Sequence, residues 1–230
     1  MKNTMQSTMT SKGLKTPRAA AIAGIIFSVL LATSIVLVRL SISSDPAEAG
    51  KWLSDGSRRT SVIVAVNLIP FAGIAFLWFI GVIRDRLGER EDRFFATVFL
   101  GSGLLFIAML FASAALTVGM LTSFHAAPST AAETGIWDLG RQATFAFLNV
   151  FAMRMAAVFI ISTSAIALRT AVINRWIAFL GLVIALVLLV AASSVPFINL
   201  LLPLWIFLVS AEILISSMRE GRKPAATPAQ

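Results

Sequence analysis

The sequence predicts an all-α fold: a polytopic membrane protein built as one bundle of six transmembrane helices, with the N-terminus and the C-terminus in the cytoplasm. Three observations predict it. Of the 230 residues, 58% are hydrophobic and only 13% are charged, whereas about 25% of the residues of a soluble domain are charged. The hydrophobic residues fall into six blocks, each near or above the ~18 residues that cross a bilayer as a helix. The Lys and Arg residues are distributed unevenly among the connecting segments.

The six blocks define the expected membrane domain, residues 19–217. The predicted spans are 19–40, 61–83, 95–121, 143–168, 176–193 and 197–217. The first block is longer than the roughly 7–15 apolar residues of a cleaved signal peptide, which indicates an uncleaved first span. Residues 1–18 are polar and basic, and residues 218–230 are rich in Pro and Ala, so both segments are predicted to be disordered cytoplasmic tails.

Two of the connections carry local signals. Only residues 194–196 separate the last two blocks, so we expect a tight antiparallel hairpin that is broken at Pro196. In the loop 41–60, Asp45 followed by Pro46 predicts the start of a short helix, and Gly56 predicts its end.

The positions of the basic residues predict the orientation. With the N-terminus inside, thirteen of the 19 Lys and Arg residues fall in cytoplasmic segments and five in outer segments, while Arg154 lies within a span. Lys and Arg accumulate in the cytoplasmic loops of membrane proteins, so the bias predicts that both ends are inside. It also accounts for the net charge of +8. The basic residues alternate with acids and form no nucleic-acid-binding motif, so no nucleic-acid partner is expected.

The residue types that most often build metal and cofactor sites are scarce. The sequence contains no cysteine and one histidine, His125, which excludes disulfides, thiolate metal sites and a cluster of histidines within one chain. Neither the HExxH pattern of zinc proteases nor the GxSxG pattern of serine hydrolases occurs. We therefore expect no cofactor, no metal and no catalytic residue. The expected partners are the lipid bilayer and, in a homo-oligomer, further copies of the chain; no substrate is indicated.

Arg154, near the middle of the predicted fourth span, is the residue that most needs an explanation. Insertion scales assign a central Arg a cost of about 2.5–3.5 kcal/mol, so its side chain is expected to face the bundle or a wet cavity. Helical side chains lean toward the N-terminus of their helix. Because this helix runs inward, Arg154 leans toward the outer face of the membrane. The candidate partners in that outer half are Asn67, Asn149 and Asn199.

Two prolines add hydrogen-bond acceptors to the same region. Pro70 and Pro203 cannot donate to the carbonyl four residues earlier, which leaves the carbonyls of Val66 and Asn199 without that partner. A guanidinium has five N–H donors and can bond several such groups at once.

Glu212 is the other charge within a predicted span, and it lies about 13 Å nearer the cytoplasm than Arg154. We expect it to meet basic residues or water at the cytoplasmic rim. Arg154, Asn67, Asn149, Asn199 and Glu212 thus form the candidate intramembrane polar site. Two interpretations remain open: a mid-membrane substrate or ion site on proline-broken helices, or internal hydrogen bonding that fixes helix packing.

The cytoplasmic loop after the second span resembles the G-x-x-x-D-R-x-G-R-R signature of the major facilitator superfamily. The matching residues are Gly81, Asp85, Arg86, Gly88 and Arg90, and Glu89 replaces a basic residue of the signature. In that superfamily the loop latches helices together during alternating access, so the resemblance implies a transporter, which with half the usual spans would have to dimerise. The alternative is a turn of mixed charge that anchors two helix ends.

The second half of the chain resembles a family of uncharacterised bacterial six-span integral membrane proteins. The resemblance covers about residues 143–210. It is carried by Arg154–Phe159, Ser162–Ser164 with Ala167–Thr170, Arg175 and Trp176 with Gly181, and Pro203–Trp205. Asn174 stands where a proline would be expected. The resemblance implies a bacterial cytoplasmic (inner) membrane and brings no activity with it.

The sequence thus favours a non-enzymatic integral membrane protein. The first alternative is a small transporter that uses the region of Arg154. The second is a membrane-embedded enzyme or an accessory subunit of a membrane complex. A transporter predicts a water-accessible cavity at Arg154, an enzyme predicts a cavity that joins two titratable groups, and a structural or accessory protein predicts a well-packed bundle.

Overall fold

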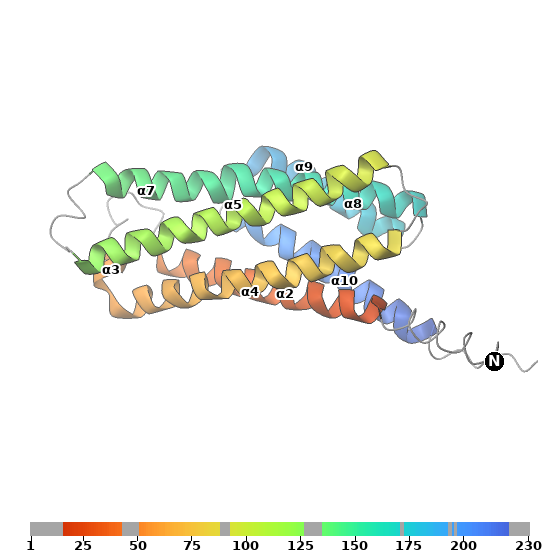
Figure 1. The fold of residues 1–230 in the computed structure, drawn as a ribbon, viewed down its shortest axis with the longest axis horizontal. Helices are drawn as coiled ribbons and strands as arrows, with labels where there is room; N and C mark the ends of the chain where they lie inside the picture. Colours follow the sequence, from red (N-terminus) through yellow and green to blue (C-terminus); the bar gives the residue numbers. More distant parts are fainter. Residues whose placement is uncertain are drawn as a thin grey trace, which may run out of the picture.

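The computed structural model describes residues 16–42, 51–87, 93–126, 135–170, 173–192, 195 and 197–220, and within these residues every regular element is a helix (Figure 1). Five helices are long and apolar enough to cross a membrane: Arg18–Ser41, Gly56–Gly81, Ala96–Ser123, Asp138–Arg169 and Ile198–Arg219. A further apolar helix, Arg175–Ala191, is shorter. The all-α class is therefore confirmed, and five spans are supported by length and composition.

The helices follow one another along the chain as α2 (Thr16–Ser41), α3 (Lys51–Ser54), α4 (Gly56–Leu87), α5 (Arg93–Ala126), α7 (Gly135–Phe145), η3 (Ala146–Ala152), α8 (Met153–Thr170), α9 (Arg175–Ala191), η4 (Ile198–Leu200) and α10 (Leu201–Glu220). α7, η3 and α8 are contiguous and form one long helix with a π-helical middle. α9 and α10 have 17 and 20 residues, against 32 in α4 and 34 in α5. They therefore accompany only part of the length of the bundle (Figure 1).

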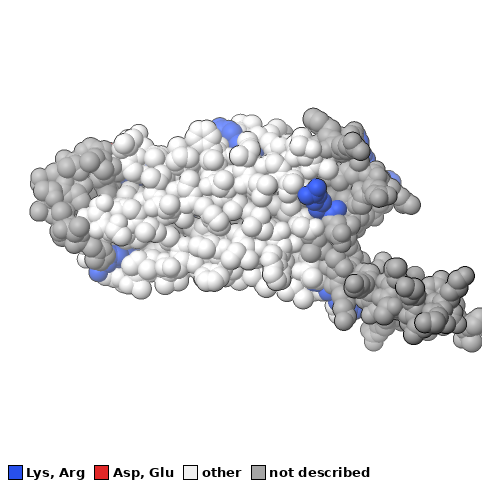
Figure 2. All heavy atoms as spheres, in the orientation of Figure 1, with Lys and Arg blue, Asp and Glu red and all other residues white. Residues whose placement is uncertain are grey.

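Neighbouring helices form a closed ring. α2 packs against α4 and α10, α4 against α5, α5 against α8, α8 against α9, and α9 against α10. The surface in Figure 2 is almost free of charge along the middle of the bundle, and most of the Lys and Arg side chains visible there lie toward its two ends. Such a distribution is typical of helices that cross an apolar layer.

A cluster of phenylalanine rings fills the space between α2, α4, α5 and α8. The rings of Phe27 and Phe76 lie 4.6 Å apart between centroids, Phe76 and Phe106 5.3 Å, and Phe76 and Phe159 5.1 Å. Phe99 stacks on Phe159 at 4.9 Å. These separations fall in the range in which aromatic pairs attract beyond their buried area. All five side chains are fully buried, so Phe serves the core here and not only the membrane surface.

Hydrogen bonds from side chains to the backbone tie several neighbouring helices together. Each of the following hydroxyl or indole groups donates to a carbonyl of a neighbouring helix: Ser34 to Ala65 (2.9 Å), Ser113 to Thr144 (3.1 Å) and Trp205 to Ile177 (3.1 Å).

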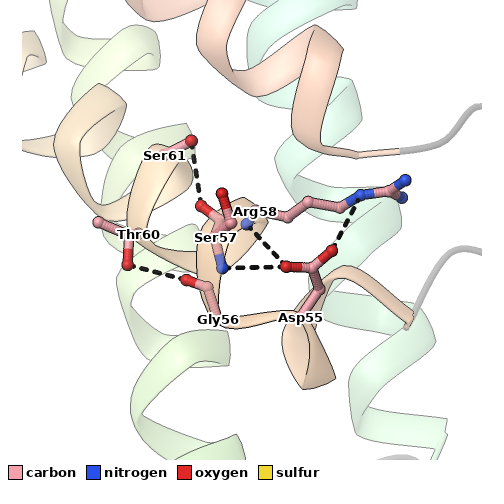
Figure 3. A network of polar contacts seen from close by, with 6 residues as sticks. All are labelled: Asp55, Gly56, Ser57, Arg58, Thr60 and Ser61. Carbon is pink, nitrogen blue, oxygen red and sulfur yellow. Dashed lines mark hydrogen bonds and ion pairs between the residues drawn. The ribbon is translucent and has the colours of Figure 1, made fainter.

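The start of α4 adds to one expectation. The short helix α3 ends at Ser54, just before Gly56 as expected, and Gly56 itself is the first residue of α4, which Asp55 caps (Figure 3). The Asp55 Oδ1 accepts hydrogen bonds from the backbone N–H groups of Ser57 (2.9 Å) and Arg58 (3.3 Å), and its Oδ2 lies 3.4 Å from the Arg58 Nε. A side-chain oxygen that accepts from the first free N–H groups is the standard N-cap arrangement. The expected cap at Asp45 lies outside the described residues.

Several helices run past the expected span limits. α2 begins at Thr16, α4 continues to Leu87 and α10 to Glu220. Hydrogen bonding continues a helix beyond the apolar block as long as no breaker intervenes. Between α9 and α10 the chain turns at Phe197, which adopts a left-handed conformation (φ 63°) and precedes η4. Residue 193 at the end of the expected fifth span, residues 194 and 196 of the expected hairpin break, the tail before Thr16 and residues 221–230 lie outside the described residues.

Candidate functional site

Asn149 and Asn199, which the sequence predicted as partners of Arg154, instead form a buried amide pair with each other. The Asn199 Nδ2 donates to the Asn149 Oδ1 at 2.8 Å, and the Asn149 Nδ2 donates to the carbonyl of Phe145 at 3.1 Å. Asn149 is 4% exposed and Asn199 is 1% exposed. The pair joins η3 to η4, and therefore the fourth long helix to the start of the last one.

Both amides lie where their helices are irregular. Asn149 is in the π-helix η3, whose last backbone bond runs from the Met153 N–H to the Leu148 carbonyl, five residues back. Where the five-residue spacing of η3 returns to the four-residue spacing of α8, one backbone carbonyl is left without an N–H donor from within the helix. Asn199 is in the short 3₁₀ segment that leads into α10, and Pro203 cannot donate to its carbonyl. π-Helical turns within α-helices are frequent at functional sites.

Arg154 follows the π-helix directly. Its Nη1 donates to the carbonyl of Val150 at 2.8 Å, and the side chain is part-buried. The guanidinium thus leans toward the N-terminus of its own helix, as the sequence predicts. Among the described residues, Asn67, Asn149 and Asn199 do not hydrogen-bond to it. Arg154 therefore provides a donor at the junction between η3 and α8.

Asn67 is not brought to the amide pair. It lies on the exposed face of α4, where its Nδ2 donates to the carbonyl of Ile63 at 2.8 Å. The cause is helical periodicity: Asn67 shares a face with Phe71, Ile74 and Trp78, while the opposite face of α4 carries the core. The sequence predicts a depth in the membrane for Asn67, but it does not indicate the rotation of α4 about its axis.

Glu212 also lies apart from the pair. Its Oε1 accepts a hydrogen bond from the backbone N–H of Asn174 at 2.7 Å, which ties α10 to the segment just before α9. Asn174 in turn caps α9 by accepting from the N–H of Trp176 (3.1 Å). The Glu212 Oε2 is buried without a hydrogen-bond partner among the described residues. Through this hydrogen bond Glu212 holds the N-terminus of α9 against α10, at a position where the helix dipole favours a carboxylate.

The residues of the loop signature are divided. Gly81, Asp85 and Arg86 belong to the last turns of α4, and Gly81 is exposed. Gly88 and Arg90 lie outside the described residues. The first part of the motif is therefore helical and not loop.

The amide pair has unused hydrogen-bonding capacity. The Asn199 Oδ1 is buried and has no partner among the described residues. An unpaired buried acceptor costs about 1–3 kcal/mol, so the site is suited to a small hydrogen-bond donor. An apolar groove of about 410 Å³ lies between Ser28, Val29 and Ala32 of α2 and Leu201, Leu204 and Phe207 of α10, and neither Asn149 nor Asn199 lines it.

Two features of this region had no clear sequence signal. The segment Ala146–Ala152 reads as an ordinary apolar helix, and nothing in it indicates π-helical spacing. The pairing of Asn149 with Asn199 joins residues 50 positions apart, which periodicity cannot reveal. Within the part of the chain that the structure describes, no three His, Asp or Glu side chains gather closely enough to hold a metal ion. No protein-family model, curated protein or solved structure matches the chain.

Proposed function

We propose that the chain is a six-span integral protein of a bacterial cytoplasmic membrane, with both ends inside, and that it acts through association within the membrane and not through catalysis. The five long apolar helices support the membrane location. α9 supports a sixth span, since 17 residues rise about 26 Å, close to the ~30 Å of hydrocarbon.

The spacing of polar residues along the helices supports the same placement. About 20 residues separate Asn149 from Arg169, and about 20 separate Asn199 from Arg219, which corresponds to about 30 Å in each case. This match with the hydrocarbon thickness supports a proposed location of the amide pair near the outer limit of the apolar layer and of the arginines near the inner one.

The absence of native cysteine allows a clean test of the topology. Single substitutions Ser57→Cys, Ser11→Cys and Ala226→Cys are introduced one at a time, and intact cells are treated with a membrane-impermeant maleimide. The proposal predicts labelling of Ser57→Cys in intact cells and labelling of the other two only after the membrane is opened. Labelling of either terminal cysteine in intact cells contradicts the orientation.

The phenylalanine cluster is the observation that carries the non-catalytic, non-transporting role. Its rings occupy the space between four helices through which a solute would have to pass. The two charged side chains of the predicted spans also bond to separate groups. Arg154 donates to the carbonyl of Val150, and Glu212 accepts from the backbone N–H of Asn174. An enzyme would need titratable groups that converge on one site.

Cysteine accessibility tests this role as well. Ser162 and Ser210 are 3% and 0% exposed, and cysteine is close to serine in size, so Ser162→Cys and Ser210→Cys probe the interior with little disturbance. The proposal predicts no maleimide labelling of either in opened membranes and full labelling after denaturation, with Ser57→Cys as the exposed control. Labelling of the interior cysteines at the rate of Ser57→Cys would support a solute pathway instead.

A small permease is the second candidate function, favoured by one specific observation. Two irregular helix segments, η3 and η4, meet at a buried amide pair, and one oxygen of this pair has no hydrogen-bond partner among the described residues. Transporters place substrate and ion sites at such interruptions, and the resemblance of residues 81–90 to the major facilitator loop belongs to this alternative. It predicts that Asn199→Cys reacts with a water-soluble reagent, whereas the leading proposal predicts that it does not.

A further inference from the structure

One face of α4 is left uncovered by the other parts of the chain that the structure describes. Phe71 and Trp78 on this face are 62% and 69% exposed. The opposite face of the same helix, which includes Ala72 and Phe76, is fully buried against the bundle. The uncovered face comprises Ile63, Val64, Asn67, Pro70, Phe71, Ile74, Leu77, Trp78 and Gly81.

The uncovered face has the spacing of a helix–helix seam. Asn67, Ile74 and Gly81 recur at intervals of seven residues, with Phe71 and Trp78 between them. Apolar residues repeating in this way keep one stripe of a helix directed at a partner helix. A Cβ placed on Gly81 meets nothing within 4 Å, so this small residue leaves room for close approach of a second backbone.

Asn67 is the one side chain on this face that lipid cannot satisfy. Its Nδ2 donates one hydrogen bond, to Ile63; its Oδ1 and second N–H have no partner among the described residues. Arg59 and Arg84, near the two ends of α4, are about 25 residues or about 38 Å apart. A hydrocarbon layer of ~30 Å centred between them places Asn67 roughly 8 Å inside its outer limit.

A second copy of the chain supplies the complementary group. Copies that share one orientation in the membrane and are related by a two-fold axis along the membrane normal bring identical residues to the same depth. A carboxamide holds both a donor and an acceptor, so two Asn67 side chains can bond to each other. A single Asn in an apolar seam fixes the register and pairing of helices in the same way.

We infer that the uncovered face of α4, from Ile63 to Gly81, is the interface of a symmetric homodimer in which Asn67 of each copy hydrogen-bonds to Asn67 of the other. This inference rests on the proposed membrane placement, because only in hydrocarbon does the amide lack an alternative partner. It goes beyond that placement in naming the partner, the helix and the register.

Disulfide cross-linking in native membranes tests the interface. Since the chain has no cysteine of its own, Ile74→Cys introduces a single thiol in the seam, and Leu186→Cys introduces one on the exposed face of α9 as the matched control. Cross-linking requires Cβ atoms about 3.5–4.5 Å apart. The inference predicts oxidation of Ile74→Cys to a covalent dimer and none for Leu186→Cys. Equal or reversed cross-linking overturns it.

The role of Asn67 is tested by the affinity of self-association. Self-association in lipid bilayers is measured by energy transfer between labelled copies. The dissociation constant of the dimer should be about 3- to 30-fold higher for Asn67→Leu than for the parent chain, in line with the measured strength of interhelical hydrogen bonds in membranes. Asn67→Gln keeps both hydrogen-bonding groups and should retain most of the affinity. Leu186→Ala should leave it unchanged.

The failure of this inference can be told from the failure of the membrane proposal. Ser57→Cys labelling and membrane flotation report insertion and orientation independently of any dimer. A chain that inserts correctly but stays monomeric at high protein-to-lipid ratio, or whose association is unaffected by Asn67→Leu, refutes the dimer interface alone. A chain that does not float with membranes refutes both.

Discussion

The side-chain amide of Asn199 donates to the side-chain oxygen of Asn149 at 2.8 Å, and this bond joins the two irregular segments of the bundle, η3 and η4. The two residues are almost wholly buried. The bond therefore locates the start of α10 against the middle of the long α7–η3–α8 helix. Its contribution to stability depends on both partners, which makes it a suitable object for a double-mutant cycle.

Asn149→Leu and Asn199→Leu are each expected to lower the free energy of unfolding by about 1–2 kcal/mol, because each leaves the other amide unpaired in an apolar environment. The double substitution should cost less than the sum, since it removes both polar groups together. Denaturant unfolding of the purified protein in mixed micelles measures the three values. Strict additivity would show that the two amides are not coupled.

Arg154→Leu is expected to lower stability by about 1.5–3 kcal/mol, because it removes a charged donor to the carbonyl of Val150. Part of this loss is offset by the lower cost of inserting Leu into the bilayer. Arg154→Lys keeps a donor and should lose less. Thermal unfolding in detergent measures both, with the exposed Arg84→Gln as the control. A fully stable Arg154→Leu variant that has lost a cellular function would favour the permease alternative.

Gly181→Ala is expected to destabilise the bundle by about 1–3 kcal/mol through overpacking. A Cβ at this position would meet the Ser164 hydroxyl and lie 2.6 Å from the Trp205 Nε1. At Gly119 a Cβ meets nothing within 4 Å, so Gly119→Ala should be neutral or slightly stabilising, as is usual for an exposed helix position. Melting temperatures of the two variants separate packing from helix propensity, and equal shifts would contradict the packing argument.

Phe76→Ala is expected to cost about 3–5 kcal/mol, because the ring contacts Phe27, Phe106 and Phe159 at the centre of the bundle. Phe179 on α9 is 53% exposed, and Phe179→Ala removes the same side chain from a position without such contacts. It should cost less than about 1 kcal/mol in the same unfolding assay. A comparable loss in both variants would indicate that lipid contact and not ring packing sets the value.

Particular residues show how far sequence reasoning reached. The apolar blocks predicted long membrane-length helices, and the structure contains five of them with a shorter sixth, so the six-span count stays a prediction. The lean of Arg154 toward its helix N-terminus was predicted from rotamer preference and is observed. Of the three asparagines grouped with it, two pair with each other and Asn67 faces outward. Hydropathy gives the depth of a residue, and in a helix that is apolar all round it does not indicate which side faces the core.

By itself, the sequence determined that this chain forms long apolar helices separated by short polar segments, because that property depends on the composition and length of continuous stretches. Only the tertiary structure decided the rotation of each helix about its axis, and with it the burial of Phe76, the exposure of Asn67 and the pairing of Asn149 with Asn199. The physical reason is that packing between segments far apart in the chain selects which face of a helix is buried. The π-helical turn at Ala146–Ala152 has no local signal, and it rotates the side chains of the following helix α8 relative to those of α7.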